Sequence, residues 1–184
     1  MKVGPLKTSR LILRPFKDTD RDAFAALNAN PVVMDDLGGP LSKDQSDTKL
    51  AHYRSAYEKT GFSRCVIELP DATFLGYAGI MLRDMQALGK HYDLGWRLNR
   101  SAWGKGYATE AACAILEHTL FEREVPEILA YTGPDNDRSQ KVMERLGLLR
   151  RPELDFSMKL DTKDTPWKGL VWSASRTQWR NPGP

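Results

Sequence analysis

Residues 92–110 read Tyr-Asp-Leu-Gly-Trp-Arg-Leu-Asn-Arg-Ser-Ala-Trp-Gly-Lys-Gly-Tyr-Ala-Thr-Glu. The segment 92–98 predicts a strand, and after Gly104 and Gly106 the apolar residues take the spacing of a helix. Glycines let a backbone approach a ligand closely. A helix N-terminus presents unpaired N–H groups and about half a positive charge, which together favour phosphate. With Lys105 as a further cation, this stretch predicts an anion site, in particular for a pyrophosphate.

Two common phosphate-binding motifs do not fit this glycine pair. A dinucleotide-binding loop needs a third glycine where this chain has Thr109, and a Walker loop needs Ser or Thr directly after Lys105. On the glycine pair alone, a tight turn from strand to helix with no ligand remains the alternative. A phosphate site here therefore has to belong to another type of loop.

On either side of this turn, periodicity and turn residues predict seven strands and four helices. The strands are expected at residues 9–16, 62–69, 74–82, 92–98, 127–132, 156–160 and 170–175. The helices are expected at residues 18–28, 42–59, 107 to about 123, and 135–146. We expect Asp18 to cap the first helix, Ser42 and Gln45 to form a capping box for the second, and residues 31–40 to form a loop.

This order of elements predicts the α/β class, with a mixed (α+β) sheet that carries helices on both faces. A strand-helix-strand unit lies at its centre. The length of 184 residues and the absence of repeats or a linker favour one domain over residues 1–184. Three tryptophans near the C-terminus are expected to pack in the core, with a homodimer surface as the alternative: Trp167, Trp172 and Trp179.

Composition narrows the function classes. The apolar content of 41% and charged content of 28% are ordinary for a soluble globular protein, and a net charge of +3 predicts no nucleic-acid or membrane partner. The sequence shows no signal peptide and no membrane span, so a cytoplasmic location is expected. Cys65 and Cys113 are interpreted as small hydrophobic residues without a disulfide. The three histidines lack the spacing of metal ligands, so we expect no metal.

The segment Trp103–Ala111 closely resembles the acetyl-CoA pyrophosphate loop of the GNAT N-acetyltransferase superfamily. The nearest branch is the RimJ/RimL type, which acetylates the N-termini of ribosomal proteins. Further similar stretches, which extend the resemblance over residues 8–180, are 8–15, 93–98, 136–142, 146–148 and Trp179. The resemblance implies a GNAT-like fold with a predominantly antiparallel sheet, acetyl-CoA as co-substrate and an amine-bearing acceptor.

The chain also departs from the superfamily pattern. Ser101 stands where the motif usually has Gln or Arg, and Met143 and Trp172 stand where many members have a tyrosine that can donate a proton. These departures keep a second hypothesis open, a non-catalytic acyl-CoA-binding module.

The resemblance also implies roles for residues of the expected site. The pantetheine arm would pair with the backbone of Trp96, Arg97 and Leu98, and one N–H there would stabilise the oxyanion of the thioester. Asn136 would bond the pantetheine amides, cap its own helix, or do both. The pyrophosphate would bind main-chain N–H groups of Trp103, Gly104, Lys105, Gly106, Tyr107, Ala108 and Thr109.

The resemblance and the positions on the expected strands also suggest candidate catalytic residues. Asp93, beside the expected thioester, is the first choice for a general base, with a salt bridge to an arginine or a solvent-exposed charge as the alternatives. Glu68 is a weaker candidate. Ser139 would lie near the sulfur of coenzyme A, or would serve only in the first turn of its helix.

The acceptor is predicted less closely. An α-amine, with a pKa near 8, is easier to deprotonate than a lysine amine near 10.4, which favours a protein or peptide N-terminus. An aminoglycoside, a polyamine or an amino acid is the alternative acceptor. Residues 32–40 are expected to contact it, and there Asp35 and Asp36 could attract a cationic amine, although two solvated loop carboxylates are the favoured interpretation.

Overall fold

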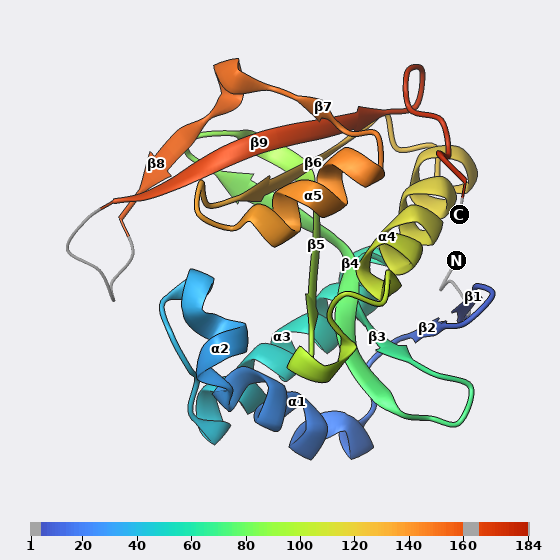
Figure 1. Cartoon of the computed structure of the whole chain (residues 1–184), viewed down its shortest axis with the longest axis vertical. Coiled ribbons are helices and arrows are strands. Elements are labelled where there is room, and N and C mark those ends of the chain that lie inside the picture. The colour runs from blue at the N-terminus through green and yellow to red at the C-terminus, as the bar shows by residue number, and fades with distance from the viewer. Residues whose placement is uncertain (1–4, 160–165, 184) are drawn as a thin grey trace.

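Nine strands pair into one sheet in the part of the chain that the computed structural model describes, residues 5–159 and 166–183 (Figure 1). The order is β1-β2-β3-β4-β5-β6-β9-β7, with β8 paired to β9 off this path. All pairs are antiparallel except β5 with β6, so the predicted mixed sheet is confirmed. The strands are β1 (Leu6–Lys7), β2 (Ile12–Arg14), β3 (Arg64–Glu68), β4 (Phe74–Met85), β5 (Gly89–Leu98), β6 (Glu127–Thr132), β7 (Leu149–Arg150), β8 (Phe156–Met158) and β9 (Trp167–Ser175).

Five α-helices accompany this sheet within the described residues. They are α1 (Arg21–Ala29), α2 (Pro31–Met34), α3 (Lys43–Thr60), α4 (Tyr107–Glu117) and α5 (Asp137–Arg145). Helix α4 continues into a π-helical turn over His118–Glu122, so the helical stretch ends close to the predicted residue 123. None of the helices in the described ranges is long and apolar enough to span a bilayer.

Strand β4 shows how the two faces of the sheet are covered. Tyr77 and Met81 pack in one apolar cluster with side chains of α1 and α3. Ala78 and Ile80 pack in the other cluster, with side chains of α4 and α5. Because successive side chains of a strand point to opposite faces, the two sets of helices cover opposite faces, as the sequence predicts. The central strand-helix-strand unit is β5-α4-β6, the one parallel connection among the described pairs.

The N-terminal third differs from the prediction in two places. The strand expected at 9–16 is shorter, since β2 covers only Ile12–Arg14, and β1 was not predicted. Asp18 does not cap a helix; the chain enters a 3-10 turn from Lys17, and the carboxylate of Asp20 accepts a hydrogen bond from the Lys17 N–H. The capping box of α3 and its end at Gly61 are confirmed.

The expected loop at 31–40 is wrong over residues 31–37, where α2 and a 3-10 turn, Asp35–Leu37, are found. The Asn30 side chain accepts hydrogen bonds from the N–H groups of Val32 and Val33, and Pro31 occupies the first turn, where its missing N–H costs nothing. This Asn-Pro pair was a helix-start signal that the neighbouring glycines obscured.

The C-terminal part is closer to the prediction. Trp172 and Trp179 are buried, and the Trp179 indole N–H donates to the Leu146 carbonyl at 2.7 Å, so core packing is confirmed for both. Strand β7 was not predicted, because it has only two residues and so cannot show the alternation of a strand. Strand β9 begins at Trp167 instead of 170, and Leu160, the expected end of the preceding strand, lies outside the described residues.

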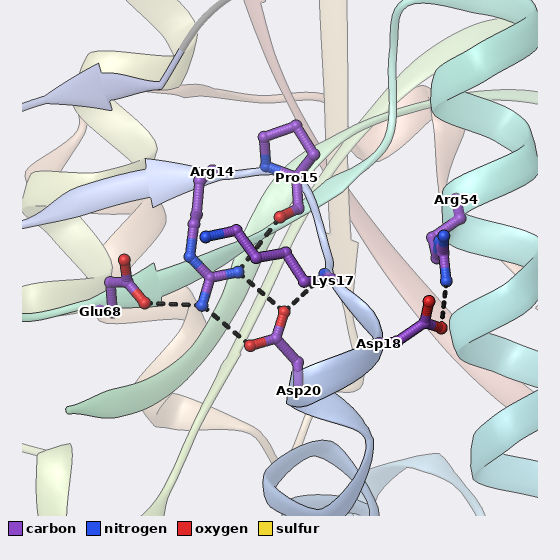
Figure 2. A network of polar contacts seen from close by, with 7 residues as sticks. All are labelled: Arg14, Pro15, Lys17, Asp18, Asp20, Arg54 and Glu68. Carbon is purple, nitrogen blue, oxygen red and sulfur yellow. Dashed lines mark hydrogen bonds and ion pairs between the residues drawn. The ribbon is translucent and has the colours of Figure 1, made fainter. Parts of the chain in front are cut away.

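A buried ion network fixes the entry to α1 (Figure 2). The Arg14 guanidinium donates to both carboxylate oxygens of Asp20, at 2.7 and 2.8 Å, and to Glu68 at 2.7 Å. Burial alone would raise the pKa of Asp20, but the hydrogen bonds from Arg14 and from the Lys17 N–H outweigh it and lower that pKa. Glu68, the weaker candidate for a base, is therefore a partner of Arg14 in this structure.

We expect Asp20→Asn to lower the free energy of unfolding by about 2 kcal/mol at pH 7, because a buried arginine loses half of its paired charge. The stabilisation by Asp20 is present above the carboxyl pKa of the unfolded chain, about 3.9, and is lost as the pH falls through the lower folded value. The gap between wild type and variant in urea unfolding should therefore close below pH 4. Asp18→Asn is the control, because that carboxylate is exposed and pairs only at the surface with Arg54 and Arg21. An equal loss in both variants would contradict the prediction.

Candidate active site

The site begins where two neighbouring strands separate. Strand β5 pairs with β4 along its whole length, whereas its pairing with β6 is the single register pair Asp93–Leu129. Beyond Asp93 the segment 94–98 continues along β4, while β6 continues along β9 toward Thr132. The two halves of the sheet thus diverge, and the end of β5 faces a gap with the N-terminus of α5 on its other side.

A cavity of about 990 Å³ lies in this gap. It is lined by the end of β5, the glycine turn, the first turns of α4 and α5, and the N-terminal residues 7–10. The predicted cofactor-binding residues line it, with the exception of Lys105, whose side chain is exposed outside the cavity: Trp96, Arg97, Leu98, Trp103, Gly104, Gly106, Tyr107, Ala108, Thr109, Asn136 and Ser139. The structure therefore brings together segments that are 40 residues apart in the sequence.

The glycine turn and the first turn of α4 line this cavity. Gly104 and Gly106 both have left-handed φ values, 75° and 79°, which glycine adopts without strain. Gly106 is the N-cap of α4 and has no side chain to accept hydrogen bonds from the first turn. The leading N–H groups of a helix have no acceptor within the helix. These donors, together with the partial positive charge of the helix end, fit a pyrophosphate.

A brace that the sequence did not reveal holds this turn in place. The Glu110 carboxylate accepts hydrogen bonds from Thr8 Oγ1 at 2.5 Å and from Arg10 N at 3.0 Å and Nε at 2.6 Å. The Arg10 guanidinium donates to the Lys105 carbonyl at 3.0 Å and lies over the Tyr107 ring, 4.8 Å from its centroid. Burial opposes ionisation of Glu110, but these hydrogen bonds lower its pKa. Arg10 and Glu110 are 100 residues apart in the sequence, so no local sequence pattern could predict their contact.

Basic side chains of α5 line one side of the cavity. Arg138 stacks on the Trp103 ring, 3.9 Å from its centroid, and the indole N–H of Trp103 donates to the Leu98 carbonyl at 2.8 Å. Lys141 and Arg145 follow Arg138 on α5 and also line the cavity. Because α5 residues three and four apart share a helix face, these three cations point the same way. They suit a ligand with further anionic groups beyond a pyrophosphate.

Asn136 caps its own helix, one of the two roles expected of it, while the bond to the pantetheine amides stays a prediction. Its Oδ1 accepts a hydrogen bond from the Ser139 N–H at 3.1 Å, which caps α5. Its Nδ2 points across the cavity and donates to Asp36 Oδ2 at 2.7 Å. The amide therefore has one half fixed in the helix cap and the other half turned to the space that a ligand would take.

Asp93 lies at the point of strand separation but is not among the cavity-lining residues. Its carboxylate forms a 2.5 Å ion pair with Arg64, and both side chains are buried, 6% and 7% exposed. Arg64 also donates to the carbonyl groups of Gly79 and Asp93 and so ties β3, β4 and β5 together. This is the salt-bridge alternative that the sequence left open for Asp93, and the geometry favours it. The role of a general base stays a prediction.

A family model described as an acetyltransferase (GNAT) domain matches residues 10–149. The chain belongs to the GNAT acetyltransferase family. A GNAT fold implies acetyl-CoA as the co-substrate, and the cavity, the N-terminus of α4 and the three cations of α5 are features that fit such a molecule.

Individual GNAT proteins extend this likeness over almost the whole chain. The uncharacterized N-acetyltransferase YnaD of Bacillus subtilis (strain 168) is 39% identical over 163 residues, 88% of this chain and 91% of that protein. An acetyltransferase structure from Agrobacterium tumefaciens str. C58 has a TM-score of 0.78 at 26% identity and covers 95% of both chains. A ribosomal-protein-S5-alanine acetyltransferase from Vibrio fischeri has a TM-score of 0.77 at 13% identity, over 97% of this chain and 100% of that one, and so shares the fold.

The two positions that usually carry tyrosine in GNAT enzymes are part of the core here. Met143 is 2% exposed on the inner side of α5, and Trp172 is 5% exposed on β9, with the Arg150 guanidinium 4.8 Å from its ring centroid. Ser139, one turn before Met143 on α5, lines the cavity. Within the described residues, the hydroxyl closest in sequence to the missing tyrosine of α5 is therefore that of Ser139.

Proposed function

We propose that this GNAT protein transfers the acetyl group of acetyl-CoA to a primary amine, preferably the α-amine of a protein or peptide N-terminus. The observation that carries the proposal is the cavity at the parting of β5 and β6, with the glycine turn at one end and Asn136 and Ser139 at the other. The shared fold with a ribosomal-protein-S5-alanine acetyltransferase supports the choice of acceptor. We infer that residues 1–184 act as one domain, because the strands form one sheet and the helices that line the cavity pack against it.

The chemistry requires little more than alignment in this site. Acetyl-CoA supplies an activated thioester, and the backbone at the end of β5 would hold its pantetheine arm beside Asn136. A neutral amine placed against the thioester carbon gains most of its rate from proximity and orientation. The departing thiol has a pKa near 8.5, so it leaves with little help from a proton donor. A weak donor such as Ser139 would therefore suffice in place of a tyrosine, although Met143 and Trp172 are buried at the positions where many members have one.

Release of free thiol from acetyl-CoA, measured in the presence of separate acceptors, tests this function. The informative pair is a peptide that begins with Ala or Ser and contains one lysine, and the same peptide with a blocked N-terminus. We expect thiol release with the first peptide and at least about tenfold less with the second, because the lysine amine is protonated at pH 7. A polyamine and an aminoglycoside complete the panel. Thiol release with one of these and with neither peptide would show the small-molecule alternative, and tight coenzyme A binding with no acetylated amine would sink the enzymatic proposal.

A further inference from the structure

The carboxylate of Asp36 bridges two elements that line the cavity, β5 and α5. Asp36 lies in the 3-10 turn Asp35–Leu37, between α2 and α3, and lines the cavity. Its Oδ1 is 3.3 Å from Arg97 Nη2 on β5, and its Oδ2 accepts the hydrogen bond from Asn136 Nδ2 at the start of α5. The favoured interpretation of two solvated carboxylates therefore holds for the exposed Asp35 but is wrong for Asp36.

The charges around the cavity give this carboxylate a special position. Two other acidic side chains line the cavity in the described residues, and both are on α4 with partners of their own. Glu110 is held by Thr8 and Arg10, and Glu117 accepts a hydrogen bond from Asn181. The cations of α5, and Lys7 and Arg10 in the N-terminal segment, repel a positively charged acceptor from those sides. An ammonium group therefore meets a favourable charge at the Asp36 end of the cavity.

The geometry of Asp36 leaves room for a third partner. An ionised carboxylate offers about four lone-pair positions, and the bonds to Arg97 and Asn136 use two of them. Arg97 is buried, with 8% of its side chain exposed, whereas Asp36 keeps 36% exposed, so one side of the carboxylate is fixed and the other is open. The two fixed bonds hold the carboxylate in place before any acceptor arrives, which reduces the entropy lost on binding.

We propose that Asp36 binds the acceptor amine as it arrives in its cationic form and so selects acceptors carrying positive charge at or next to the reacting nitrogen. The bound ammonium group releases its proton to solvent before the neutral amine attacks the thioester. This inference rests on the proposed function, and it names the acceptor end of the same cavity. Asn136 and Arg97 are positioning residues for Asp36.

Steady-state kinetics of Asp36→Asn tests the proposal, because this variant removes the charge and keeps the shape. We expect the KM for the amine to rise about tenfold or more, because the variant loses one charge-assisted hydrogen bond to the amine. The kcat should change less than about threefold. The affinity for coenzyme A in calorimetry should stay within about twofold, a result that a merely structural role of Asp36 would not give. Asp35→Asn removes a neighbouring charge from the same turn and should leave both constants near those of wild type.

Each contrary result is decisive. An unchanged KM for the amine in Asp36→Asn, or an equal rise in Asp35→Asn, overturns the assignment. So does a coenzyme A affinity that falls as much as the amine affinity. If wild type acetylates none of the amines, the proposed function fails separately, and calorimetry of spermidine with the coenzyme A complex then tests Asp36 alone. Weaker binding in Asp36→Asn than in wild type supports the inference in that case, and equal binding or none in wild type overturns it.

Discussion

Asp93→Asn should lower the free energy of unfolding by about 3 kcal/mol or more, because it leaves the buried Arg64 guanidinium without its counter-charge. For a chain of this length such a loss corresponds to a fall in Tm of about 10 °C. Urea unfolding followed by tryptophan fluorescence measures the free energy directly. The effect is large because Arg64 joins three strands at the point where β5 and β6 part.

Asp84→Asn is the matched control for this change. Asp84 lies on β4, opposite Lys90 of β5, but its side chain is exposed. Removing its charge should therefore lower the free energy of unfolding by less than about 0.5 kcal/mol. The double variant Arg64→Met, Asp93→Asn should recover part of the stability, since removing both charges of a buried pair is far less costly than removing one. If Asp93→Asn instead unfolds like wild type and loses kcat with a changed pH profile, Asp93 acts as the base and the ion pair is secondary.

The same ion pair shows what the sequence could and could not predict. The strand 92–98, its position beside a parallel neighbour and the place of Asp93 on it follow from periodicity and from the order of elements. The partner does not, because Arg64 comes from another strand, and only register brings them together. One signal was present: Gly95 has no side chain where the Arg64 guanidinium lies, and an added Cβ there would sit 2.7 Å from Arg64 Nη2. A glycine in a strand can mark such a close approach.

The candidate site divides in the same way. The glycine turn, the cap at Asn136 and the cavity face of α4 are local, since each depends on residues within a few positions of one another. The brace of Arg10 with Glu110 and the bridge from Asp36 to Asn136 each join segments about 100 residues apart. Local patterns place such residues on their elements but cannot pair them. The short helix α2, which carries the chain to Asp36, was missed for a local reason, the competing turn signal of Gly38 and Gly39.

Gly106→Val should weaken coenzyme A binding about 100-fold, equivalent to about 2.7 kcal/mol. The residue has φ of 79°, a conformation that a β-branched residue rarely adopts, and an added Cβ would lie 3.3 Å from Arg10 Nη2. Relief of this strain moves the N-cap of α4 and turns its leading N–H groups away from the cavity. Calorimetry with coenzyme A measures the loss, and 3′-dephospho-coenzyme A, which keeps the pyrophosphate, should lose affinity by the same factor.

Gly89→Val separates this effect from a general loss of stability. Gly89 has a comparable φ of 64° as the first residue of β5, with open space around it, and does not line the cavity. Both variants therefore carry similar backbone strain, and only Gly106→Val alters the donors at the helix end. Equal coenzyme A affinities in Gly106→Val and wild type would mean that the phosphates are held elsewhere, since a displaced turn cannot keep the same hydrogen bonds. If Gly106→Val weakened the binding of coenzyme A but not that of 3′-dephospho-coenzyme A, the lost contacts would be those of the 3′-phosphate. The basic residues Arg138, Lys141 and Arg145 would then be the main phosphate-binding groups.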